Sequence, residues 1–171
     1  MIRIVLTGSE STGKTTLAMR LAAHYGAEYV PEFVREYAAR RGGLIGMEDH
    51  DPIAYGQIAL EDAHIARAPG VLVQDTDLLS TVVYCRHYWG HCPPWIVEQA
   101  HERRPDLYLL CEIDLPWVAD GIRDRGHMRE EMHELFRAAV GASGSAFVTI
   151  EGDSKERFAQ AVAAIDSVLS P

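Results

Sequence analysis

The stretch GSESTGKT at residues 8–15 combines two glycines, a lysine and several hydroxyl side chains in a spacing that suits phosphate binding. It matches the pattern G-x-x-x-x-G-K-[ST] through Gly8, Gly13, Lys14 and Thr15. Such a loop turns successive backbone N–H groups toward phosphate oxygens, and the helix that follows presents its positive N-terminus to them. Lys14 is expected to bind the β- and γ-phosphates, and the Thr15 hydroxyl to ligate Mg²⁺. The sequence therefore predicts a P-loop; the alternative is a flexible glycine-rich turn.

Two acids at the ends of expected strands are placed to complete this site. Asp75 ends the apolar run VLVQD and is predicted to hold magnesium together with Thr15, unless it only caps the next helix. Glu32 follows a short apolar stretch that ends at Pro31. It is predicted to be the general base, or to accept the hydrogen bond that aims the attacking hydroxyl. The alternative for Glu32 is an acidic first helical turn that stabilises the helix dipole. The sequence leaves open which of the two acids is the base.

Residues 115–127 have the glycine, proline and charge content of a mobile lid. If the P-loop belongs to an enzyme that transfers a phosphoryl group, water must be excluded until the acceptor is bound, and a closing lid does this. Arg123 and Arg125 are therefore predicted to contact the charge that develops on the transferred phosphoryl group, with an ordinary solvated loop as the alternative.

The elements that position these residues alternate between strand and helix. Apolar runs predict strands at 2–7, 27–30, 71–75, 106–113 and 146–152. Helical spacing predicts helices at 14–25, 32–41 (stopped by Gly42 and Gly43), 51–68, 76–88, 93–104, 129–141 and 153–169. Asp51 is expected to cap the third helix and Pro52 to occupy its first position. The alternation predicts an α/β fold, a parallel sheet with helices on both faces, in a single domain over residues 1–171.

Composition narrows the functional class. The 171 residues carry a formal net charge of −9, which argues against a nucleic-acid partner. Three irregularly spaced cysteines favour a reducing compartment, and the first apolar run is too short for a signal peptide or membrane span. We expect a cytoplasmic protein with no membrane partner, of undetermined oligomeric state. The cluster YCRHYWGHC suggests zinc as a hypothesis, but its spacing matches no familiar zinc motif.

Missing motifs narrow the P-loop class. The chain has no N-K-x-D or T-K-x-D stretch to read guanine and no L-S-G-G-Q signature, and it is too short for a helicase motor. These absences leave a small kinase that phosphorylates a compact acceptor.

The chain resembles the ribosylnicotinamide kinase domain of the NadR-type NAD-salvage proteins. The resemblance rests on GSESTGKTTLA, PEFVREY, DPIAYGQ, DTDLLSTVVY, DLYLLCEIDLPWVADGIR and GDSKERF, which follow in the family's order. It implies a P-loop NTPase fold with five strands in the order 2-3-1-4-5 and a lid. It also implies that MgATP phosphorylates the 5′-hydroxyl of nicotinamide riboside to give nicotinamide mononucleotide.

The resemblance also implies roles for individual residues. The ATP phosphates and magnesium would be held by Gly8, Ser11, Thr12, Gly13, Lys14, Thr15 and Thr16, with Arg123 and Arg125 from the lid. The riboside would be faced by Glu32, Arg35, Asp75 and Asp77, and Asp120 with Arg123 would belong to the lid. Where the family carries an aromatic before the first acid of E-x-x-R-E/D-Y, this chain has Pro31, so another aromatic must stack on the nicotinamide ring. The candidates for stacking are Tyr55, Tyr84, Trp89 and Trp117.

Two alternative functions stay open. One is a kinase for another nucleoside or small alcohol, and the other is a P-loop sensor of ATP or NAD metabolites without turnover. Glu32, Asp75 and the two lid arginines favour an enzyme, because a sensor needs no base and no clamp on a transition state. The 171 residues leave no room for the adenylyltransferase and DNA-binding parts of longer relatives, so the reaction is expected to stop at the mononucleotide.

Overall fold

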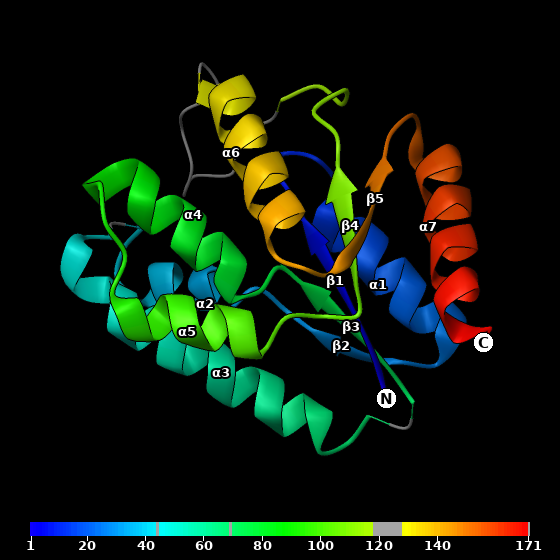
Figure 1. Ribbon diagram of the computed structural model, residues 1–171, viewed down its shortest axis with the longest axis horizontal. Coiled ribbons are helices and arrows are strands. Elements are labelled where there is room, and N and C mark those ends of the chain that lie inside the picture. Colours follow the sequence, from blue (N-terminus) through cyan, green and yellow to red (C-terminus); the bar gives the residue numbers. More distant parts are fainter. Residues whose placement is uncertain (44, 69, 118–127, 171) are drawn as a thin grey trace.

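The computed structural model describes residues 1–43, 45–68, 70–117 and 128–170, which form a parallel β-sheet with helices on both faces (Figure 1). The strands are β1 (Ile2–Thr7), β2 (Glu28–Val30), β3 (Val71–Asp75), β4 (Leu107–Cys111) and β5 (Ala146–Ile150). Their order across the sheet is β2-β3-β1-β4-β5, and every neighbouring pair is parallel. The predicted fold class and the strand order 2-3-1-4-5 are confirmed.

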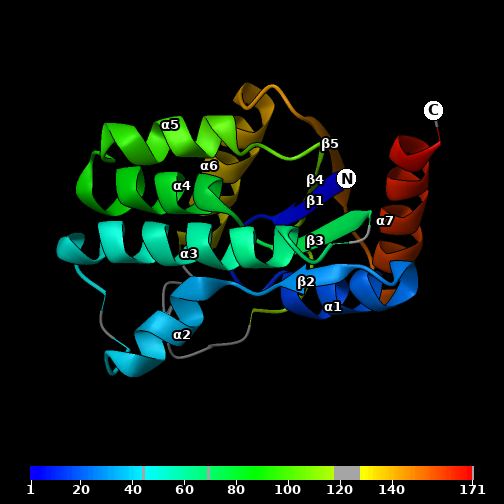
Figure 2. The same cartoon turned by 90° about the horizontal axis from the view of Figure 1, so that it is seen from below.

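The helices cover the two faces unequally. They are α1 (Lys14–Tyr25), α2 (Phe33–Arg40), the short 3₁₀ turn η1 (Met47–Asp49), α3 (His50–Ile65), α4 (Leu78–Trp89), α5 (Pro94–Glu102), α6 (Arg129–Ala142) and α7 (Ser154–Leu169). Figure 2 shows α1 and α7 on one side of the sheet and α3, α4, α5 and α6 on the other. The second group extends beyond the carboxyl ends of the strands, so it forms a wall beside the place where the predicted site residues meet.

The central strands are buried on both faces, which explains their continuous apolar sequences. In β4, Leu109 and Cys111 belong to the core shared with α1 and α7. Tyr108 and Leu110 point to the opposite face, where they pack with Val140 and other residues of α6. Each face of the sheet therefore has its own core, and the strand ends at the P-loop edge are held from both sides.

The start of α3 differs from the prediction. The helix begins at His50, with Asp49 at the N-cap position, rather than with Asp51 as the cap. The reason is that the 3₁₀ turn continues directly into the helix, which places Pro52 in the first turn, where backbone N–H groups have no helical partner to lose. Asp51 instead accepts a hydrogen bond from the indole nitrogen of Trp95 in α5, at 3.0 Å.

Candidate active site

The glycines of the P-loop are required by its conformation and by space. Gly8 has φ 126°, and a Cβ on it would lie 2.8 Å from the carbonyl oxygen of Cys111 in β4. Gly13, directly before α1, has φ 77°. Ser11 also has a positive φ, 56°, a backbone strain that non-glycine residues accept mainly at functional sites. The segment is therefore a fixed turn, as the prediction of a P-loop requires.

Lys14 folds back over this loop. Its side-chain nitrogen donates to the carbonyl oxygen of Ser9 at 2.6 Å and to the hydroxyl of Thr12 at 3.3 Å, and the residue is 6% exposed. The Thr12 hydroxyl itself donates to the Ser9 carbonyl at 2.9 Å. A buried ammonium group thus lies against the inner wall of the loop.

Asp75 lies beside the P-loop because β3 pairs with β1. Leu6 of β1 is the register partner of Asp75, and the Thr15 hydroxyl donates to the carboxylate of Asp75 at 2.5 Å. Burial raises the pKa of Asp75, and the neighbouring charge of Glu32 raises it further, whereas the Thr15 hydrogen bond and the Lys14 charge lower it. The structure therefore brings together the two oxygen groups that the sequence predicts for magnesium.

Glu32 reaches the same place from β2. It occupies the N-cap position of α2, is 6% exposed, and forms an ion pair with the Arg35 guanidinium at an N–O distance of 2.8 Å. Tyr29, which sequence reasoning missed, also faces this pair of acids. Burial and then the charges of Asp75 and Glu32 raise the pKa of Tyr29 to about 12. The available signal in the sequence was that Tyr29 lies in the short strand that leads to Glu32.

The N-terminus of α2 is hydrogen-bonded to α3, and this contact positions Glu32. The backbone N–H of Phe33 donates to the side-chain oxygen of Gln57 at 3.0 Å. The Phe33 ring sits where Gly56 leaves space, because a Cβ on Gly56 would be only 2.0 Å from a ring carbon. The glycine of DPIAYGQ therefore allows α2 and α3 to approach closely.

Asp77 has a different environment from Asp75. Its carboxylate accepts from the Tyr108 hydroxyl at 2.6 Å and from the backbone N–H of Leu79 at 3.1 Å, as the N-cap of α4. Burial raises the pKa of Asp77 to about 7. Both carboxylate oxygens are thus engaged within the protein, and the contact with a riboside that the resemblance implies stays a prediction.

The four aromatic candidates for stacking lie against different neighbours. Tyr55 is 60% exposed and stacks on Trp95, with ring centroids 4.5 Å apart. Tyr84 meets the edge of Phe136, a residue of α6. Trp89 lies edge-on against His50, with centroids 4.3 Å apart, and Trp117 is 37% exposed. Which of them contacts a base stays a prediction.

Several predicted site residues are placed only in part. Thr16 is exposed in the first turn of α1. Of the predicted lid, Leu115 to Trp117 are described, whereas Asp120, Arg123 and Arg125 lie outside the described residues.

Two arginines that the sequence analysis did not assign hold the P-loop backbone from α6 and α7. Arg129 donates to the carbonyl oxygens of Leu115 and Ser11, at 2.8 and 3.0 Å. Arg157 donates to the carbonyl oxygen of Thr12 at 3.0 Å. The sequence did contain a signal for Arg157, because it shares the buried stripe of α7 with Ala161 and Ala164. A charged residue on an apolar stripe requires internal partners.

The stretch YCRHYWGHC and all three cysteines lie in the described part of the chain. Cys85 and Cys111 are buried free thiols, and Cys92 is a half-buried one. Within the described ranges, no three His, Cys, Asp or Glu side chains group together in a way that could hold a metal ion. In the same ranges, no helix has the length and apolar character needed to cross a membrane.

The P-loop between β1 and α1, the acid at the end of β3 and the strand order define a protein with the P-loop NTPase fold. A family model described as an AAA domain matches residues 3–157, so the chain belongs to that family. It is similar to the trifunctional NAD biosynthesis/regulator protein NadR of Escherichia coli (strain K12), with 32% identity over 166 residues. That match covers 93% of this chain and 40% of the relative, so the chain spans about two fifths of the relative's length.

Two crystal structures of NadR protein resemble this chain over its length. One is in complex with NR and one is in complex with NAD and AMP-PNP, with TM-scores of 0.77 and 0.76. Each of the two matches has 26% sequence identity and covers 97% of this chain and 49% of the NadR chain. The chain is therefore a NadR-type kinase domain, which confirms the resemblance drawn from its motifs.

Proposed function

We propose that this protein phosphorylates the 5′-hydroxyl of nicotinamide riboside, with MgATP as donor, to give nicotinamide mononucleotide. The observation that carries the proposal is the convergence of Glu32 and Asp75 beside Lys14 and Thr15 of the P-loop. A base, an acid for the metal and a phosphate-binding loop then meet at one edge of the sheet. The likeness to NadR protein, whose structures contain NR and the ATP analogue AMP-PNP, supports the choice of substrates.

The residues present fit a magnesium ion by the chemistry of their donors. The hydroxyl of Thr15 and the carboxylate of Asp75 are hard oxygen ligands, and they face each other at 2.5 Å. When bound, magnesium neutralises negative charge on the phosphate oxygens. Lys14 and the inward N–H groups of the P-loop are expected to hold the β- and γ-phosphates.

Glu32 is the better placed of the two acids to receive the acceptor hydroxyl. Asp75 is already engaged with Thr15, whereas Glu32 approaches from β2 and is held by Arg35. The 5′-hydroxyl would give its proton to Glu32 as its oxygen bonds to the γ-phosphorus, and the bond between that phosphorus and the bridging oxygen of ADP would break. Because phosphoryl transfer depends mostly on positioning and electrostatics, aiming this hydroxyl is the main contribution expected of Glu32.

The test is to incubate the purified protein with MgATP and a panel of nucleosides and to measure ADP. Nicotinamide riboside should give the highest kcat/KM, and mass spectrometry should show a product heavier by one phosphoryl group. ADP formation with a different nucleoside, and none with nicotinamide riboside, would replace the proposed acceptor. Binding of MgATP without ADP formation from any acceptor would instead indicate a sensor.

A further inference from the structure

The outer side of the P-loop is held by arginine side chains at two consecutive carbonyl groups. Arg129, at the start of α6, donates to the Ser11 carbonyl, and Arg157, in the first turn of α7, donates to the Thr12 carbonyl. Both arginines are buried, with exposed fractions of 9% and 3%. A buried guanidinium is costly unless it has acceptors, and the backbone carbonyl groups supply acceptors for both arginines.

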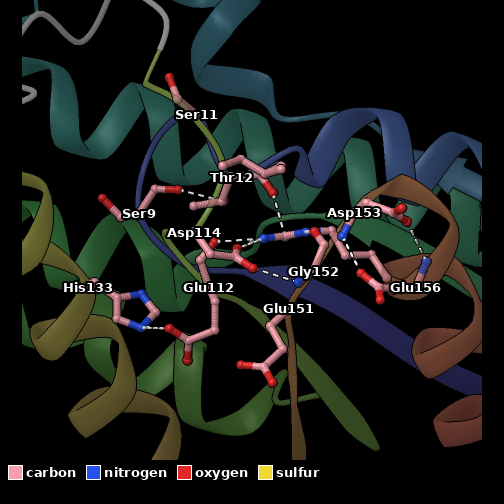
Figure 3. Close-up of polar contacts among 12 residues, drawn as sticks. Ser9, Ser11, Thr12, Glu112, Asp114, His133, Glu151, Gly152, Asp153 and Glu156 are labelled. Carbon is pink, nitrogen blue, oxygen red and sulfur yellow. Dashed lines mark hydrogen bonds and ion pairs between the residues drawn. The ribbon is translucent and has the colours of Figure 1, made fainter.

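Arg157 uses all three of its nitrogens and joins three separate segments. Beyond the Thr12 carbonyl, it donates to the carbonyl oxygens of Gly152 at 2.7 Å and Glu112 at 3.1 Å, and it is ion-paired with Asp114. Figure 3 shows Thr12, Asp114 and Gly152 converging on this contact. Asp114 is itself tied to the backbone N–H of Gly152. The P-loop is thereby attached to the end of β4 and to the turn between β5 and α7.

Because each peptide is planar, the contacts to the outer carbonyl groups also determine where the N–H groups on the inner face of the loop point. In a planar trans peptide the C=O and the following N–H point in opposite directions. An arginine that holds the Ser11 carbonyl therefore directs the N–H of Thr12 away from itself, and one that holds the Thr12 carbonyl does the same for the N–H of Gly13. These are the amides that a P-loop directs at phosphate oxygens.

We propose that Arg129 and Arg157 are positioning residues for the nucleotide: Arg129 orients the N–H of Thr12 and Arg157 orients the N–H of Gly13 toward the phosphates. The proposal rests on the proposed function only in taking a nucleotide as the ligand. Neither arginine needs to touch the nucleotide. Preorganised amide donors need no reorganisation when the phosphates bind, which is the source of the gain in affinity.

The test compares binding of ADP and AMP by titration calorimetry to the wild type, Arg157→Met and Arg157→Lys. The amides serve phosphates beyond the first, so Arg157→Met should weaken ADP binding by about tenfold or more while AMP binding changes by less than about threefold. Arg157→Lys keeps the charge but loses the planar fork, and it should restore only part of the affinity. Arg20→Met is the matched control, because Arg20 donates to the Ser154 carbonyl at the start of α7 without contacting the P-loop.

A residue-specific readout separates orientation from general loosening. In ¹⁵N-labelled protein, Arg157→Lys should mainly change the Gly13 amide resonance and its response to ADP, and Arg129→Lys should mainly change that of Thr12. A merely structural arginine would instead lower the melting temperature and weaken AMP and ADP equally. If Arg157→Met does not fold, the two lysine variants carry the test.

Three outcomes would overturn the proposal: unchanged ADP affinity in folded Arg157→Met, equal losses for AMP and ADP, or full affinity in Arg157→Lys, which would assign the effect to charge alone. The measurements need no nucleoside acceptor. If the wild type binds ADP but phosphorylates no nucleoside, the proposed function fails while this inference can still hold. If the wild type is an active kinase and its arginine variants bind ADP normally, only this inference fails.

Discussion

Replacing Gly56 by alanine should destabilise the protein, although alanine is the better helix former. Gly56 lies inside α3, where the exchange normally gains about 1 kcal/mol. Here the new Cβ would lie 2.0 Å from a ring carbon of Phe33, whereas carbon atoms normally approach to about 3.5 Å. The ring must move by more than an ångström, and such overpacking costs about 1–3 kcal/mol.

Because the required displacement is large, we expect the upper part of that range, and hence a net loss of about 1–2 kcal/mol in the free energy of unfolding. For a domain of this size, each kcal/mol lowers the melting temperature by about 2–4 °C. Thermal and urea unfolding measure the effect. Since Phe33 directly follows Glu32, the displaced ring should also lower kcat.

A double-mutant cycle makes the reasoning refutable. In a Phe33→Ala background the ring is absent, so Gly56→Ala should become stabilising by about 1 kcal/mol, a coupling of about 2–3 kcal/mol between the two sites. Gly141→Ala in α6 is the control, because its Cβ would meet no atom within 4 Å and the change should be neutral or stabilising. If Gly56→Ala raises the melting temperature of the wild type, or has the same effect in both backgrounds, the close contact between Gly56 and the Phe33 ring would be refuted.

The remaining predictions concern the charged groups. Lys14→Ala and Asp75→Ala should each lower kcat/KM by about a hundredfold or more without unfolding the protein, as circular dichroism checks, and near-normal rates would contradict their roles. Glu32→Gln should reduce kcat more than it weakens ATP binding; the reverse, or mainly a loss of stability, would indicate a structural acid. Burial raises the pKa of Asp77 from 3.8 to about 7. Between these two pH values, the carboxyl group of Asp77 is protonated in the folded state and ionised in the unfolded state. Asp77 therefore lowers the free energy of unfolding as the pH rises through this interval. Asp77→Asn should therefore gain stability relative to the wild type between those pH values and level off above them, and a constant difference from pH 4 to pH 8 would refute this.

Much of the fold could be predicted because its signals are local. The P-loop pattern depends on glycines that permit positive φ, and the apolar runs of β1, β3 and β4 follow from burial on both faces. The caps are also local, since Asp153 begins α7 with the carboxylate contacts expected of an N-cap. The predicted start of α3 was wrong because a 3₁₀ turn continues into the helix. This continuation depends on the backbone conformation before the helix and not on Asp51 or Pro52.

The amino-acid sequence by itself determined that a phosphate-binding loop follows the first strand, that an acid follows the second strand and that acids end and follow the third, because turn chemistry and strand periodicity act between near neighbours. Only the tertiary structure decided which of these acids meet the loop. The pairing of β3 with β1 brings Asp75 to Thr15, and Asp77, two residues later, turns under Tyr108 instead. The tertiary structure alone revealed that Arg157, which is distant in the sequence, donates a hydrogen bond to the Thr12 carbonyl. Such contacts depend on strand order and helix packing, which no local pattern encodes.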